Sequence, residues 1–346
     1  MKKQVLYGAT LVMILAACSN NETEGISPDQ PKNAVPIRIG QTVEGMTARA
    51  AVENGSKVTA TVLTVNYSSS YDAATVWNNF TAQSSNVVNE GNNTLTTPAN
   101  ISTATFTAGT NEAVALQPVL YYYADNGTAL VAVAPDGNLS GSKIEMKLQD
   151  GEQDVMYADK QVDTKPDSQK AADNSPVALT FAHKTTQLNF AFQLSKAPTS
   201  SWKDQSVSVK SISIQNASVP VSVNYANGTV NFKKPGTSLE VPGIVAGNNI
   251  GTTALKIGRP VMVDASSDIK LDVTLTVGSK DYTFSNVPIM KNGGTNGEKL
   301  QTAIGSSHLI TLTVTEPVKP SDGVEITTQA TVTQWAPGQA GSGELK

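Results

Sequence analysis

The sequence predicts an all-β protein with two domains. Its 346 residues correspond to about two domains of ordinary size. Runs rich in Thr and Val alternate between apolar and polar residues, which is the period of a β-strand, and 26 Gly and 17 Pro residues interrupt them. Long stretches with helical spacing are scarce. Hydrophobic residues make up 39% of the chain and charged residues 16%, a balance that excludes a disordered protein.

The N-terminal residues have the form of a bacterial lipoprotein signal. Residues 1–17 carry Lys2 and Lys3, followed by a short apolar run and small residues before Cys18. The run is too short for a transmembrane helix, which needs about 20 apolar residues. The segment LAAC at 15–18 resembles a lipobox, in which the cysteine thiol receives diacylglycerol. The alternative is an ordinary signal peptide followed by an incidental cysteine.

Residues 18–49 are expected to hold a lipid tether and one strand. Residues 19–34 are rich in Asn, Glu, Pro and Ser and lack an apolar period, which is typical of a flexible linker. Alternation then begins, because Val35, Ile37 and Ile39 would lie on one face of a strand. The turn-rich segment that follows contains Arg49.

Residues 50–175 are expected to form the first domain. Residues 58–68 are apolar on both sides, which predicts a strand inside a sandwich. Residues 116–135, LQPVLYYYADNGTALVAVAP, hold two apolar runs around an Asp-Asn-Gly turn and predict a hairpin. The best helix candidate, at 72–80, is short.

Residues 176–346 are expected to form the second domain. The stretch at 160–176 is polar, nearly lacks aliphatic residues and contains Pro166 and Pro176, so we place the boundary between the domains there. Alternating runs follow, and YANG at 225–228 and VGSKD at 277–281 predict hairpin turns.

The inventory of charged and reactive residues argues against several functions. The net charge is −4, so there is no basic excess to bind a nucleic acid. The only histidines are His183 and His308 and the only cysteine is Cys18, so the chain lacks the Cys and His ligands of a structural zinc site. Neither histidine lies in a recognisable motif of a catalytic triad. Phosphate-binding glycine motifs are missing as well. We therefore expect a protein that is not an enzyme and has no cofactor or metal.

Four stretches, in order along the chain, resemble the fimbrillin family of Bacteroidales, the type V pilins. They are LQPVLYYYADNGTALVAVAPDG, GEQDVMYAD, LTFAHKTTQLNF and VEITTQATVTQWAPG. Each motif is degenerate alone, whereas the ordered set with lipobox Cys18 covers most of the chain. The resemblance implies two transthyretin-like antiparallel β-sandwich domains in tandem.

The resemblance also implies a processing route and partners. An outer-membrane lipoprotein precursor, anchored in lipid through Cys18, would be exposed at the cell surface and cut there by an arginine-specific protease. The matching cut follows Arg49 and makes Ala50 the new N-terminus. Of the other two arginines, Arg38 lies in the candidate strand and Arg259 precedes a proline. An uncut surface Arg49 is the alternative.

Strand exchange would then build extracellular fimbriae that support adhesion. Removal of the strand with Val35, Ile37 and Ile39 would open a groove with unpaired edges, to which a strand of another subunit can add. The expected donor is residues 324–336, whose one face carries Val324, Ile326, Thr328, Ala330, Val332 and Gln334. Two alternatives remain: residues 324–336 are simply the last strand of their own domain, or the protein is a permanently lipid-anchored surface protein that binds a glycan or host ligand.

Overall fold

The fold is almost entirely β. The computed structural model describes residues 36–43, 55–67, 73–83, 100–110, 112–122, 127–162, 176–236, 238–266, 268–291, 298–317 and 325–334. The first half contains β1 (Arg38–Val43), β2 (Lys57–Tyr67), α1 (Ala73–Asn78), β3 (Ile101–Thr107), β4 (Val114–Ala115), β5 (Gly127–Ala134), β6 (Gly137–Ser140), β7 (Lys143–Met146), β8 (Met156–Val162) and β9 (Val177–His183). The second half contains β10 (Thr186–Leu194), β11 (Val207–Gln215), β12 (Val219–Asn224), β13 (Val230–Lys233), β14 (Leu239–Glu240), β15 (Leu255–Val263), β16 (Lys270–Val277), β17 (Lys280–Pro288), β18 (Ser306–Thr315) and β19 (Glu325–Gln334).

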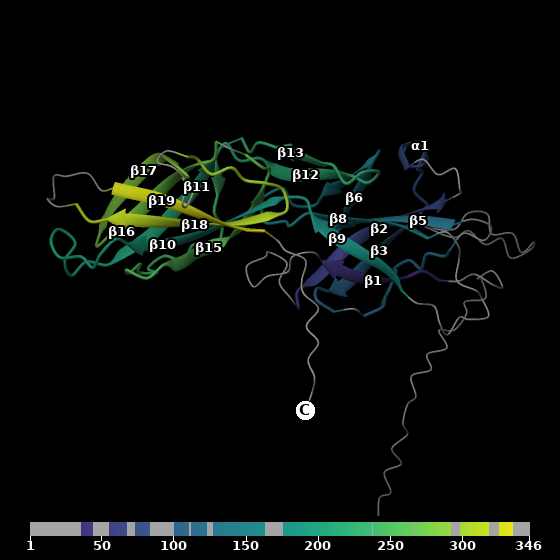
Figure 1. Cartoon of the computed structure of the whole chain (residues 1–346), viewed down its shortest axis with the longest axis horizontal. Helices are drawn as coiled ribbons and strands as arrows, with labels where there is room; N and C mark the ends of the chain where they lie inside the picture. The colour runs from purple at the N-terminus through teal and green to yellow at the C-terminus, as the bar shows by residue number, and fades with distance from the viewer. Residues whose placement is uncertain are drawn as a thin grey trace, which may run out of the picture.

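The two halves lie end to end along the long axis of the molecule (Figure 1). The first half is built on a seven-stranded sheet in the order β3-β2-β5-β8-β9-β1-β4. This sheet closes on itself, because Thr103 in β3 forms an antiparallel bridge with Gln117, just after β4. The two backbone bonds of that bridge measure 3.0 and 2.9 Å. The inside of the closed sheet is filled by a core that includes Ile39, Phe106 and Phe181.

The second half is a β-sandwich. One sheet has the order β15-β10-β18-β19 and the other β14-β11-β16-β17. Alternate residues of both sheets face each other across a large apolar core, as β16 shows with its strict alternation of buried and half-buried residues.

A third sheet joins the halves. Its order is β13-β12-β7-β6, so two strands come from each half. This sheet and α1 cover the outer face of β2, β5 and β8, where Trp77, Tyr157 and Tyr225 are buried. Residues of β2 are consequently buried on both sides, which explains why residues 58–68 are apolar on both faces.

Most of the local predictions are confirmed. The helix at 72–80 is α1, and the turns at 225–228 and 277–281 connect β12 to β13 and β16 to β17. The hairpin predicted at 116–135 is wrong, because β5 pairs with β2 on one side and with β8 on the other. The residues before it instead bridge to β3 and to Pro36.

Strand pairing also differs from the expected division of the chain. The sequence assigned Val177–His183 to the second domain, yet this strand, β9, pairs with β8 and β1 of the first sheet. The change from one half to the other falls between β9 and β10. Among the strands of the described residues, β1 with β9 and β10 with β18 pair in parallel, and the other strand pairs are antiparallel.

Candidate functional site

The first strand occupies an interior place in the closed sheet. On one side β1 pairs in parallel with β9, from Ile39 opposite Val177 to Val43 opposite Phe181. On the other side it pairs antiparallel with β4, and the Ile37 N–H donates to the Leu120 carbonyl at 2.7 Å. A strand that enters from outside the predicted first domain therefore supplies hydrogen bonds to both of its neighbours.

One face of β1 points into the core of the first half. Ile37, Ile39 and Val43 are each at most 1% exposed, and Arg38 between them is exposed. On the adjacent strand, Leu179 and Phe181 line the same core, where the ring of Phe181 lies 5.2 Å from that of Phe106. These contacts make β1 an integral part of the core, as its apolar alternation suggested.

The core face of β1 also carries one polar residue. Gln41 is 2% exposed, and its Nε2 donates to the carbonyl oxygens of Thr107 at 2.8 Å and Thr110 at 2.7 Å. Thr107 ends β3 and Thr110 comes three residues later, so both acceptors lie at the turn after this strand. Sequence reasoning missed this residue, although it continues the alternation of Ile37 and Ile39.

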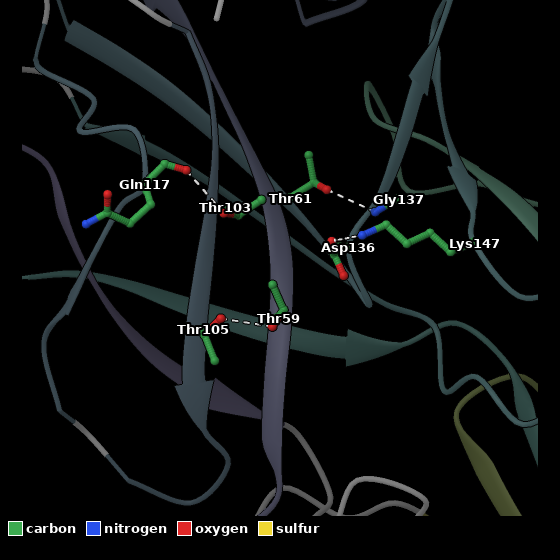
Figure 2. A network of polar contacts seen from close by, with 8 residues as sticks. All are labelled: Thr59, Thr61, Thr103, Thr105, Gln117, Asp136, Gly137 and Lys147. Atoms are coloured by element: carbon green, nitrogen blue, oxygen red, sulfur yellow. Dashed lines mark hydrogen bonds and ion pairs between the residues drawn. The ribbon is translucent and has the colours of Figure 1, made fainter.

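Polar side chains reinforce the far side of the closed sheet. Figure 2 shows the Thr103 hydroxyl donating to the Gln117 carbonyl at 3.1 Å and the hydroxyls of Thr59 and Thr105 paired across β2 and β3 at 2.9 Å. The Gly137 N–H donates to the Thr61 hydroxyl at 3.1 Å and fixes the start of β6. The first two bonds hold β3 against the residues after β4 and against β2, and none of the three involves β1.

The expected processing residues lie outside the part of the chain that the structure describes. These residues are Cys18, Val35, Arg49, Ala50 and Val324. Of the predicted removable strand, the structure describes Ile37 and Ile39, both in the slot between β9 and β4.

The predicted donor segment forms β19 within its own sheet. It pairs antiparallel with β18 over ten positions, from Ser306 opposite Gln334 to Thr315 opposite Glu325. Thr328 and Ala330 are buried, and Ile326 packs against the second core. Val332 lies opposite His308.

The outer edge of β19 is partly engaged. The Ala330 N–H donates to the Met290 carbonyl at 2.9 Å, and the Thr328 hydroxyl donates to the Pro288 carbonyl at 2.6 Å. In this structure β19 is thus the last strand of its own sheet, as one of the alternatives from the sequence supposed. Its use as a donor to another copy stays a prediction.

The two histidines lie in different surroundings. His183 is buried, and its Nδ1 lies 3.0 Å from Oδ1 of Asp154 and 2.9 Å from Oδ2. His308 on β18 is 1% exposed and has no hydrogen-bond partner among the described residues. Burial lowers the pKa of His308 to about 4. Neither histidine belongs to a group of three or more His, Cys, Asp or Glu side chains in the described ranges that could hold a metal ion.

A buried carboxylate fixes the end of β18. Glu316 accepts hydrogen bonds from the backbone N–H groups of Thr199, Ser200 and Trp202 at 2.9, 3.0 and 2.7 Å. Burial raises the pKa of Glu316, and the bonds from Thr199, Trp202 and Ser200 outweigh that effect, so the pKa is lowered. The sequence held no signal for this contact, because the partners are more than one hundred residues apart.

The fold and the slot define a class: an all-β protein of two halves in tandem, whose first sheet is completed by a strand from the N-terminal side. No helix in the described ranges is long and apolar enough to span a membrane. The family model described as fimbrillin-like matches residues 72–335. The chain therefore belongs to the fimbrillin-like family. No curated protein matches the sequence.

Several crystal structures resemble the chain. A "putative cell adhesion protein" from Bacteroides uniformis is 18% identical, covers 88% of this chain and 100% of its own, and has a TM-score of 0.48. A fimbrial protein from Bacteroides vulgatus is 14% identical over 86% of this chain and 99% of its own, with a TM-score of 0.42. A fimbrilin from Porphyromonas gingivalis is 11% identical over 88% and 99%, with a TM-score of 0.44.

Proposed function

We propose that this protein is a structural subunit of cell-surface fimbriae that assembles by strand exchange after proteolysis. Membership of the fimbrillin-like family supports a fimbrial role at the cell surface. Export begins with the lipoprotein signal, and acylation of Cys18 holds the precursor in the outer membrane. The subunit does its work by binding other subunits, with no chemical step of its own.

The observation that carries the proposal is the position of β1. This strand lies inside a closed sheet, paired on both sides, yet it precedes Arg49 in the sequence. A cut between Arg49 and Ala50 therefore breaks the only covalent link between β1 and the strands with which it pairs. The strand that completes the first core then depends on noncovalent contacts alone.

Arg49 is the arginine best suited to such a cut. A protease binds its substrate as an extended chain, so an arginine inside a paired strand is a poor site. Arg38 lies in β1, between β9 and β4. Arg259 lies in β15, forms an ion pair with Glu152 at 2.6 Å and precedes Pro260.

Loss of β1 would leave a slot with two free edges and an apolar floor. The free edges belong to β9 and β4, and the floor includes Leu179 and Phe181. Unpaired edges of this kind recruit an extended strand from another chain. The candidate is β19 of a second copy, because its residues alternate between small or apolar and polar side chains. A head-to-tail contact of this type does not close and so produces a filament.

N-terminal sequencing and polymer analysis test the proposal. The full chain is treated with an arginine-specific protease and compared with an Arg49→Ala variant, and an Arg38→Lys variant serves as a matched control. We expect Ala50 as the new N-terminus and a ladder of polymers in the wild type and the control, with neither product in Arg49→Ala. Treated protein that begins at Ala50 but stays monomeric, or a surface form that keeps an acylated Cys18, would refute the proposal; the second result would favour a permanently anchored binding protein.

A further inference from the structure

The slot around β1 is apolar at every core-facing position but one. Ile37, Ile39 and Val43 fill apolar space, whereas Gln41 places its amide against the Thr107 and Thr110 carbonyls. When β1 leaves the slot after a cut at Arg49, Gln41 leaves with it. Any strand that replaces β1 must then meet the same two carbonyl oxygens.

A hydrogen-bonded turn presents these two carbonyls. The Thr110 N–H and hydroxyl both donate to the Thr107 carbonyl, at 3.2 and 2.9 Å, and Gly109 takes a φ of 86° that closes the turn. The Thr110 carbonyl accepts its hydrogen bond from Nε2 of Gln41. Thr107 and Thr110 are half-buried, and a carbonyl accepts and cannot donate. An incoming side chain with an N–H or O–H therefore restores these bonds, whereas a purely apolar one leaves the Thr110 carbonyl without this donor.

The C-terminal tail contains three glutamines, and their neighbours differ. If Gln329 took the place of Gln41, Glu325 would take the buried place of Ile37, where a charge is costly. If Gln339 took the place of Gln41, Pro337 would take the place of Ile39, and a proline has no N–H to donate to the ladder. Only Gln334 is flanked on its own face by apolar residues on both sides, as Gln41 is. Those flanking residues are Ala330, Val332 and Ala336.

We infer that Gln334 of one subunit replaces Gln41 of the next, donates to the Thr107 and Thr110 carbonyls and thereby sets the register of the exchanged strand. This inference rests on the proposed strand exchange. If the tail runs in the same direction as β1, it forms the same parallel ladder with β9. Ala330 and Val332 then take the places of Ile37 and Ile39.

The outward face accepts this register. Thr333 falls at the place of Gly40, where an added Cβ would lie 3.4 Å from Cγ of Pro176, an ordinary contact distance. Thr331 falls at the place of Arg38, which is exposed.

The same register gives an order of events. At each apolar place the tail offers a smaller side chain than β1 does: Ala for Ile37, Val for Ile39 and Ala for Val43. Less apolar volume is buried, so the tail fills the slot less well than the original strand. An intact β1 therefore excludes the tail of a neighbour, and exchange waits for the cut.

Disulfide trapping tests the register directly. In β9, Ala178 is exposed and lies opposite Gly40, so the register brings Thr333 of the incoming tail beside it. After the cut the remaining chain has no cysteine of its own, because Cys18 is the single one. We expect the double variant Ala178→Cys/Thr333→Cys to give disulfide-linked oligomers after protease treatment, and Ala178→Cys/Thr331→Cys or Ala178→Cys/Trp335→Cys to give none.

Polymer growth by glutamine variants supplies the second readout. Gln334→Leu is expected to slow growth about tenfold, which corresponds to the loss of one net hydrogen bond. The matched control Gln329→Leu should grow like the wild type. If polymers form but are trapped through position 331 or 335, or if Gln334→Leu grows like its control, the register is refuted while strand exchange stands. If correctly cut wild type forms no polymer, the proposed function fails, and the inference fails with it.

Discussion

Acidification is expected to weaken the second half through a single buried histidine. His308 is 1% exposed and lies between β10 and β19, with Leu188 and Val332 as its neighbours across the strands. Its ring nitrogens have no hydrogen-bond partner among the described residues. A proton on this ring would place an unpaired charge in an apolar site, which is why burial lowers the pKa.

The sign and size of the effect follow from the two pKa values. The pKa of His308 is about 4 in the folded protein, against 6.5 for a histidine exposed to water, as in an unfolded chain. The unfolded chain therefore binds a proton before the folded one does, and stability is lost as the pH falls from about 6.5 toward about 4. A gap of about 2.5 between the pKa values corresponds to a loss of about 3 kcal/mol in the free energy of unfolding.

Urea unfolding between pH 7.5 and 4 measures this loss. The comparison is with His308→Leu, which keeps an apolar side chain at the site and cannot take up the proton. The two proteins share every other titratable group, so the difference between the two unfolding free energies isolates His308. We expect the difference to change by about 3 kcal/mol over this range in favour of the variant. A difference that stays constant with pH would refute the reasoning.

Three further perturbations are expected to act on other parts of the fold. Glu316→Ala leaves three backbone N–H groups without their acceptor, so the free energy of unfolding should fall by about 2–3 kcal/mol. Faster amide exchange at Thr199, Ser200 and Trp202 would locate the loss, and unchanged exchange there would contradict the assignment. Gly228→Ala should lower the melting temperature, because a Cβ would lie 2.5 Å from the Tyr157 ring at a φ of 69°; the control Gly247→Ala has a similar φ but open space around it, and equal losses would show that the close approach has no effect. Phe181→Ala should cost about 3–5 kcal/mol by emptying the core beneath β1, whereas the exposed Thr180→Ala should change little in the same urea titration; an equal loss in both would argue against a filled core.

Much of the fold could be predicted because its signals are local. Alternation with a period of two marked most strands, and the turns at 225–228 and 277–281 carry residues that suit a hairpin. The partner of a strand is a different matter, since it depends on residues far away in the chain. β5 follows the Asp-Asn-Gly sequence that predicted a hairpin, yet its partners are β2 and β8.

The candidate site was predictable to the same extent. The alternation of Ile37 and Ile39 indicated a strand with a buried face, and this is observed. The role of Gln41 was not visible, because its partners are backbone carbonyls 66 and 69 residues away, and a backbone carbonyl leaves no mark in a sequence. Assignment of β9 to the second domain failed for a related reason: the polar stretch before it resembles a linker, although the strand after it returns to the first sheet.

The sheet shared by the two halves has a mechanical consequence. Ser222, Val223 and Asn224 of β12 lie opposite Glu145, Ile144 and Lys143 of β7, so the halves are stitched together at more than the single peptide connection between β9 and β10. Bending the molecule between its halves would break the hydrogen bonds between β12 and β7 and expose the buried side chains packed beside them. We therefore expect the two halves to move as one rigid unit. A force applied at one end of the molecule should be transmitted to the other end without stretching the connection between the halves.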